Sequence, residues 1–182
     1  LAIDRTSHRS VLAGLVLSGS VPVWFYPERH PEFGLPIGVA ADSLAAVAAQ
    51  AKGALVTSPS YVGTISRVRP LADVAHAHGI PLAIDQAWGA HLDFGVPGHP
   101  SALAEGADVA VTSIHKALMG YTQTAIISSQ GDLVPAALIN RGVDLTTTTS
   151  PSGTLLGSID ATRAAMEVEG ASLWSTRTRL DA

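Results

Sequence analysis

Short apolar segments alternate along the chain with longer segments in which apolar residues recur at helical spacing. The apolar segments predict strands at residues 1–3, 21–26, 54–57, 82–84, 109–112 and 125–128. The longer segments predict helices at residues 8–17, 43–51, 71–78, 102–105, 131–139 and 158–169. Strands such as Leu82-Ala83-Ile84 are continuously apolar, which is typical of strands buried on both faces. We therefore expect an α/β fold with a mostly parallel sheet and helices on both of its faces.

Capping residues and breakers mark the boundaries of these elements. Thr6-Ser7, Asp42 and Ser101 are candidate helix caps, and Gly19 is a candidate stop signal. Residues 27–36 contain three prolines and predict a loop. No Pro/Gly-rich linker divides the chain, so residues 1–182 are treated as part of one domain.

Composition excludes several classes of protein. Of the 182 residues, 47% are hydrophobic and 14% are charged, and the net charge is −4. The basic residues are scattered, so we expect no nucleic-acid partner. No apolar run approaches the roughly 18–20 residues of a membrane span, and the first ten residues do not have the pattern expected of a signal peptide. The absence of cysteine excludes disulfides and thiolate metal sites and fits a cytoplasmic location; HExxH-type spacing is absent too, so no metal is expected.

Polar residues follow two of the predicted strands. Asp85 ends one apolar strand, and Ser113, His115 and Lys116 follow the next one. The carboxyl ends of parallel strands meet at one edge, where ligands bind. We expect Lys116 to be partly buried there, which would lower the pKa of its amine and make it nucleophilic. A lysine and an acid at one edge suit pyridoxal 5'-phosphate (PLP), which needs an amine for its Schiff base and a carboxylate for its ring nitrogen.

Each candidate also has a plainer interpretation. Lys116 could snorkel at a strand end, Asp85 could be a cap or a structural ion-pair partner, and His115 could simply pack. His8 could stack on a flat cofactor or be an exposed residue of a first helical turn.

The remaining candidate residues are weaker. His91 could line the same pocket as Asp85. His76 and His78 are predicted to be surface residues on different faces of one helix. Lys52, at a helix end, is expected to face water.

Two longer stretches of sequence point to a particular protein family. The strings AIDQAWGAH (83–91) and GADVAVTSIHKALMGYTQTAII (106–127) resemble the major domain of the Orn/Lys/Arg decarboxylases, which are fold-type I PLP enzymes. The resemblance extends, in the same order, to TSHRSVLAGLVLSGSVPVW (6–24), VTSPSYVGT (56–64) and TTSPSGTLLGSIDATRAAME (148–167). It therefore covers nearly the whole chain.

The resemblance implies a role for each candidate. Lys116 would bind PLP through a Schiff base, and Asp85 would pair with the pyridine nitrogen. His8 would stack on the ring, with Ala87 against the opposite face. Ser113 would contact the phosphate. His115 would lie against cofactor and substrate, where it or Lys116 could return a proton to the substrate.

The resemblance also implies an activity and an assembly. The activity is decarboxylation of arginine, lysine or ornithine to an amine, as in polyamine biosynthesis. The assembly is a homodimer or larger homo-oligomer, in which residues 148–150 approach the active site across the interface. The family usually has Glu where this chain has Gln86, which would remove a charge near the site. Residues 1–182 are expected to be a partial PLP-binding major domain, without the upstream phosphate-binding turn and the small carboxyl-terminal domain.

Three alternatives stay open from the residues alone. One is another fold-type I PLP enzyme, such as an aminotransferase or aldolase. A second is a truncated, non-catalytic copy. The third is a serine–lysine acyl enzyme, because Ser113 to Lys116 fits S-x-x-K, although the partner elements S-D-N and K-T-G are absent.

Overall fold

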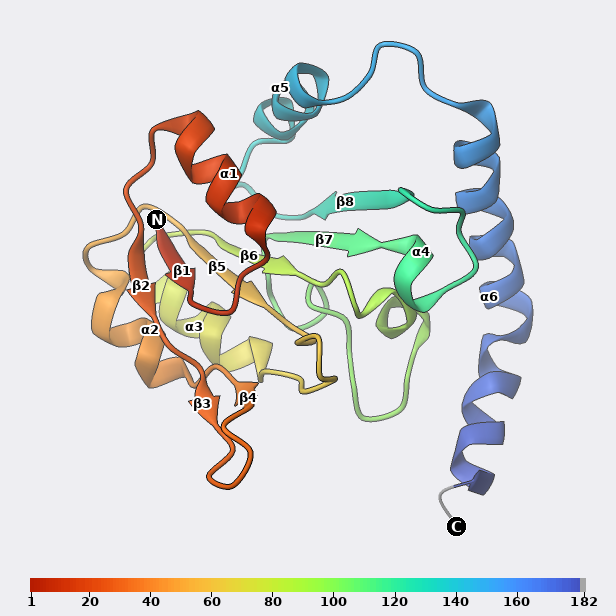
Figure 1. Ribbon diagram of the computed structural model, residues 1–182, viewed down its shortest axis with the longest axis horizontal. Coiled ribbons are helices and arrows are strands. Elements are labelled where there is room, and N and C mark those ends of the chain that lie inside the picture. Colours follow the sequence, from red (N-terminus) through yellow and green to blue (C-terminus); the bar gives the residue numbers. More distant parts are fainter. Residues whose placement is uncertain (181–182) are drawn as a thin grey trace.

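A six-stranded sheet forms the centre of the computed structural model, which describes the backbone of residues 1–180 and the side chains of residues 1–170 (Figure 1). In spatial order the strands are β2 (Val23–Phe25), β1 (Ala2–Asp4), β5 (Ala54–Thr57), β6 (Leu82–Asp85), β7 (Val109–Ser113) and β8 (Ala125–Ser129). All neighbours pair in parallel except β7 and β8. The predicted mostly parallel α/β sheet is confirmed.

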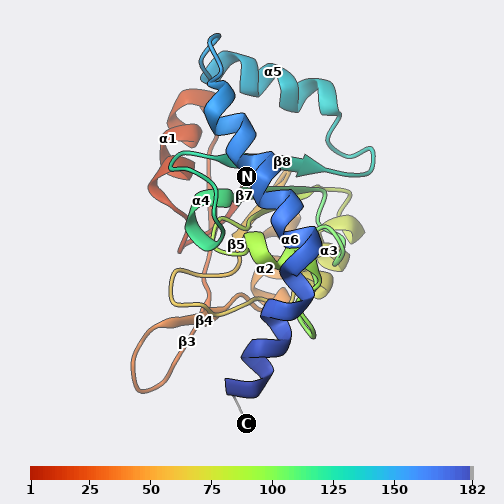
Figure 2. The same cartoon turned by 90° about the vertical axis from the view of Figure 1, so that its right-hand side faces the viewer.

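Helices cover both faces of the sheet, as predicted. In Figure 1, α1 (Arg9–Ser18) and α5 (Ala136–Thr146) lie on one side, and α2 (Ala41–Ala48) and α3 (Val68–Ala77) lie on the other. The long helix α6 (Gly153–Leu180) runs past the carboxyl ends of the central strands and faces the viewer in Figure 2. It is attached there through Ser158, whose hydroxyl accepts from the backbone N–H of Tyr121.

The hydrophobic core lies between the sheet and the pair α2–α3. Leu71, Ala72 and Ala75 recur at helical spacing on α3 and are at most 1% exposed. They pack with Leu44 of α2 and Leu82 of β6, both fully buried. This face of the sheet is closed.

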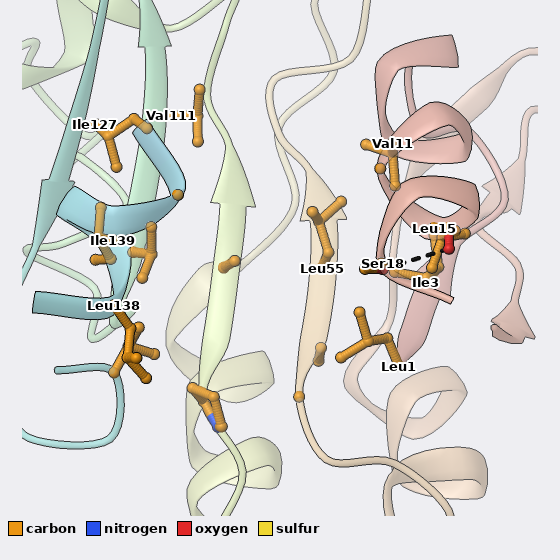
Figure 3. A pocket seen from close by; sticks show the side chains of 18 of the residues that line it. Leu1, Ile3, Val11, Leu15, Ser18, Leu55, Val111, Ile127, Leu138 and Ile139 are labelled. Carbon is orange, nitrogen blue, oxygen red and sulfur yellow. Dashed lines mark hydrogen bonds between the residues drawn. The ribbon is translucent and has the colours of Figure 1, made fainter. Parts of the chain in front are cut away.

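The opposite face holds an open apolar trough of about 530 Å³. Figure 3 shows its walls: Val11 and Leu15 come from α1, Leu55 and Val111 from the sheet, and Leu138 from α5. None of the α5 side chains is buried. This helix therefore flanks the sheet without sealing it.

Several predicted boundaries are wrong. Residues 27–36 are not only loop, because β3 (Glu28–Arg29) and β4 (Pro36–Gly38) form a small antiparallel hairpin there. Residues 102–105 form a turn instead of a helix, although the backbone N–H of Glu105 donates to the carbonyl of Ser101. Helix α5 begins only after Pro135, whose ring suits a helix start.

Two of the predicted caps are also wrong. The cap of α1 is His8, whose Nδ1 accepts from the backbone N–H of Ser10, and not Thr6-Ser7. Asp42 lies inside the first turn of α2, where a carboxylate still suits the helix dipole. The stop at Gly19 is confirmed by its left-handed φ of 63°.

His76 and His78 are both exposed, as predicted, and His76 also contacts a buried carboxylate. Nε2 of His76 lies 3.0 Å from Oδ2 of Asp108, which is 5% exposed. His78 is exposed and contacts the carbonyl of Val74, on its own helix.

Within residues 1–180, no helix has both the length and the apolar character needed to cross a bilayer. Among residues 1–170, whose side chains the structure describes, no group of three or more His, Cys, Asp or Glu side chains is placed to hold a metal ion.

Candidate active site

A cavity of about 410 Å³ opens at the carboxyl ends of the central strands, within the range of small-molecule sites. Asp85, the last residue of β6, lies opposite Thr57 of β5 and Val111 of β7 in the sheet. The loops after β1, β5 and β6 and the short helix α4 (Ile114–Ala117) complete its wall. The lining residues are Thr6, His8, Thr57, Ser60, Tyr61, Asp85, Ala87, Trp88 and Lys116.

Four of the six predicted site residues line this one cavity: His8, Asp85, Ala87 and Lys116. They come from three separate loop regions that only the parallel topology brings together. Ser113 and His115 are not among the lining residues. Ser113 is buried at the end of β7.

His115 faces the loop before β8. Its Nδ1 lies 3.0 Å from the carbonyl oxygen of Thr124. Because a carbonyl only accepts, Nδ1 carries the hydrogen, and Nε2 is the nitrogen that can take up a proton.

Lys116 lies on α4, the single helical turn that follows β7. The expectation that its side chain is partly buried is wrong, because Lys116 is exposed. Its Nζ lies 5.0 Å from the centroid of the Trp88 ring, within the range of a cation–π contact. The amine is therefore held by an aromatic face at the cavity wall.

Asp85 and His8 are each oriented by the backbone. Oδ1 of the half-buried Asp85 accepts from the N–H of Ala87 at 3.1 Å. Nδ1 of His8 accepts from the N–H of Ser10 at 3.3 Å and lies 2.9 Å from the Ser10 hydroxyl. The Asp85 carboxylate and the His8 ring are therefore both held in place by neighbouring residues of the protein.

Sequence reasoning missed Asp4. This carboxylate is 0% exposed at the end of β1. It accepts from the N–H and the hydroxyl of Thr6, at 3.0 and 2.6 Å, and from the N–H of Thr57 at 3.3 Å. It thereby fastens the loop that carries Thr6 and His8 to the end of β5. The sequence does contain a signal for Asp4: it is an acid that directly follows apolar residues of a strand, as Asp85 is.

The buried hydroxyls of Ser7 and Thr57 have no hydrogen-bond partner. Leaving such a group unpaired costs about 1–3 kcal/mol. Thr57 lines the cavity next to Asp85, its pairing partner on the neighbouring strand. Together with an amine, a carboxylate and an imidazole ring, this set fits a flat, polar aldehyde such as PLP.

Gln86 directly follows Asp85 but is not among the residues that line the cavity. Its side chain is 1% exposed, accepts from the N–H of Ala102 at 2.8 Å and donates to Asp93 at 3.3 Å. A glutamate at this position would set one carboxylate against another. Burial raises the pKa of Asp93, an effect partly offset by the Gln86 amide, the Ser101 hydroxyl and the charge of His91.

Comparison with known proteins identifies the family. The pattern described as "Orn/Lys/Arg decarboxylase, major domain" matches residues 1–180. The chain belongs to this family. The match argues against the serine–lysine acyl enzyme, although Ser113 does directly precede a helical turn.

The related proteins are named as decarboxylases of two amino acids, arginine and lysine. An arginine decarboxylase of Bacillus subtilis is 34% identical over 176 residues, which cover 95% of this chain and 36% of that protein. The lysine decarboxylase LdcA of Pseudomonas aeruginosa is 27% identical and covers 91% of this chain and 25% of the relative. The chain thus spans about a third of the length of the arginine decarboxylases it matches.

Solved structures show the same fold. The constitutive lysine decarboxylase of E. coli superimposes with a TM-score of 0.73 at 23% identity, over 91% of this chain and 25% of that chain. The serine palmitoyltransferase of Sphingomonas wittichii gives a TM-score of 0.69 at 22% identity, over 98% of this chain and 44% of that chain. The expected large-domain fold of fold-type I PLP enzymes is confirmed.

Proposed function

We propose that the protein decarboxylates a basic amino acid (arginine, lysine or ornithine) with PLP as cofactor. The observation that carries the proposal is that Lys116 and Asp85, from different strand ends, line one cavity of suitable size. Family membership and relatives named arginine and lysine decarboxylases support it. The alternative of a non-catalytic copy is addressed by the experiment below.

Each residue of the cavity has a task in this proposal. PLP, when bound, supplies an aldehyde that condenses with amines and a protonated ring that accepts the electron pair left when CO₂ departs. Lys116 would be the amine that holds the cofactor, and the Trp88 ring would stabilise that amine whenever it is free and protonated. Asp85 would hold the proton on the ring nitrogen. His8 and Ala87, which line the same cavity, would pack against the ring.

Proton return to the product has two candidate donors. Lys116 lies in the cavity, whereas His115 would have to deliver a proton from Nε2, since Nδ1 is bound to the carbonyl of Thr124. We also propose that Ser113 contributes to holding the phosphate through its hydroxyl.

We propose a homodimer that acts in the cytoplasm, with residues 1–182 as part of a PLP-binding major domain. Thr148 and Ser150 are exposed in the connection between α5 and α6, where a partner could reach them. The cysteine-free composition supports the location.

The proposal is tested by incubating the protein with PLP, reducing it with borohydride and mapping the label by mass spectrometry. We expect label on Lys116, lost in Lys116→Ala and kept in the matched variant Lys52→Ala. In the full-length protein, Asp85→Ala should lower CO₂ release on the order of 100-fold or more, because the electron sink loses its counter-charge. Unselective label on Lys52 and the amino terminus, or near-normal turnover of Asp85→Ala, would contradict it.

A further inference from the structure

Asp4, the last residue of β1, is a fully buried carboxylate that neutral donors hold in place. It is 0% exposed. Its Oδ1 accepts from the N–H of Thr6, and its Oδ2 accepts from the hydroxyl of Thr6 and from the N–H of Thr57. A buried carboxylate is costly unless it accepts hydrogen bonds of this kind. The position of Asp4 and the positions of these three donors are therefore bound to each other.

The segment from Asp4 to His8 has its backbone fixed at every step. Only three residues lie between the two. The N–H of Arg5 donates to a carbonyl of β2 at 2.9 Å. The N–H of Thr6 donates to the Asp4 carboxylate at 3.0 Å, and the N–H of Ser7 donates to the Asp4 carbonyl at 3.1 Å. Since two of these three bonds end on Asp4, this residue determines where the chain delivers His8 to the start of α1.

The bond to Thr57 connects the same segment to the centre of the sheet. Strand β5 lies between β1 and β6, and Thr57 at its end pairs with Asp85. Asp4 thus sets the loop that carries Thr6 and His8 against the strand ends that form the floor of the cavity. Asp4 itself does not line the cavity, whereas Thr6 and His8 do. Any effect of Asp4 on a ligand would therefore act through its neighbours.

We propose that Asp4 is a positioning residue for the cofactor, which holds His8 where the imidazole would pack against the PLP ring. This inference rests on the proposed function and adds to it a residue that does not touch the cofactor. Both oxygens of a carboxylate accept, whereas an asparagine side chain has one accepting oxygen and an NH₂ group that donates. In either orientation, an asparagine at this position would leave one backbone N–H, of Thr6 or of Thr57, without its acceptor.

The test compares four forms of the full-length protein: the parent, Asp4→Asn, His8→Ala and the double variant. The measurements are the dissociation constant of PLP and the visible circular dichroism of bound PLP, which reports how the ring is held. Asp4→Asn should raise the dissociation constant about 3- to 10-fold, the loss expected for one misplaced ring contact, and change the dichroism in the same direction as His8→Ala. If Asp4 acts through His8, Asp4→Asn should change neither quantity further in the His8→Ala background.

The matched control is Asp108→Asn. Asp108 is 5% exposed and accepts from the backbone N–H of Leu82, but it lies directly before β7, at the end of the sheet opposite the cavity. Asp108→Asn should therefore keep the dissociation constant and the dichroism of the parent. Should Asp4→Asn not fold, Thr6→Val takes its place in the same comparison, because it removes the hydroxyl bonded to Asp4. Thr6→Ser should then restore the values of the parent.

The outcomes separate this inference from the proposed function. An unchanged dissociation constant in Asp4→Asn, or a loss of the same size with and without the His8 ring, would overturn the role of Asp4 alone. An equal loss in Asp108→Asn would also overturn it, because any buried carboxylate would then have the same effect. A parent protein that binds no PLP would overturn the proposed function, and this inference with it.

Discussion

Gln86 and Asp93 show how single side chains hold the loop that follows β6. The buried Gln86 amide bridges the Asp93 carboxylate and the backbone N–H of Ala102. The same loop carries Ala87 and Trp88 into the cavity wall. A residue outside the site thereby positions two residues inside it.

The raised pKa of Asp93 makes stability depend on pH in a definite direction. A carboxyl whose pKa is raised on folding binds protons more tightly in the folded protein than in the unfolded chain. Its contribution to the free energy of unfolding therefore falls as pH rises from the ordinary pKa of 3.8 through the higher folded value. At pH values above the folded pKa, Asp93 is fully charged, and the cost of burying that charge lowers the free energy of unfolding by its full amount.

We predict that Asp93→Asn raises the free energy of unfolding more at pH 7 than at pH 3, as measured by urea denaturation. The asparagine keeps an oxygen that can accept from Gln86 but has no charge to desolvate. Because the charge of His91 acts on Asp93, parent and variant should both carry His91→Asn. If the variant and the parent differed in free energy of unfolding by the same amount at pH 7 and pH 3, burial would not be the main cause of the raised pKa of Asp93.

At the scale of elements, Asp108 joins α3, β6 and β7. It lies directly before β7, and its Oδ2 accepts from the N–H of Leu82 at 2.8 Å. The same oxygen lies 3.0 Å from Nε2 of His76 on α3. One buried carboxylate thus fixes where β6 begins and how α3 lies against it.

We predict that Asp108→Ala lowers the free energy of unfolding by about 1–3 kcal/mol, because the buried N–H of Leu82 loses its acceptor. Asp108→Asn, which retains an acceptor oxygen, should cost less. The exposed residue Asp132 provides a matched control, since Asp132→Ala removes a carboxylate at the surface. Equal stability of Asp108→Ala and Asp132→Ala in urea denaturation would refute this role.

At the scale of the whole molecule, the two faces of the sheet differ. The face under α2 and α3 is closed, with Leu71 at 0% exposure, whereas Leu138 on α5 is 61% exposed at the edge of the trough. A parallel sheet is stable when both faces are covered, so the two faces contribute unequally to stability.

We predict that Leu71→Ala lowers the free energy of unfolding by about 2–5 kcal/mol, since it leaves a cavity in a closed core. Leu138→Ala should change it by about 0.5 kcal/mol or less, because the side chain is mostly in water already. Thermal or urea unfolding of the two variants compares the faces directly. Similar losses for both would mean that α5 seals its face more tightly than its exposure indicates.

The amino-acid sequence by itself determined the alternation of strands and helices, and with it the mostly parallel sheet. It also determined that Asp85 and Lys116 meet at one edge, because strand ends converge in any sheet of this topology. The resemblance to the decarboxylase family also predicted His8 and Ala87 as site residues, and both line the same cavity in the structure.

Only the tertiary structure decided which way the individual side chains turn. The contacts of Asp4 with Thr57, of Gln86 with Ala102 and of Lys116 with Trp88 join residues from separate loops. Periodicity along a chain reports which face of an element is apolar, but it carries no information about the direction in which a loop packs. Those directions follow from contacts between segments far apart in sequence, and these contacts exist only once the chain has folded.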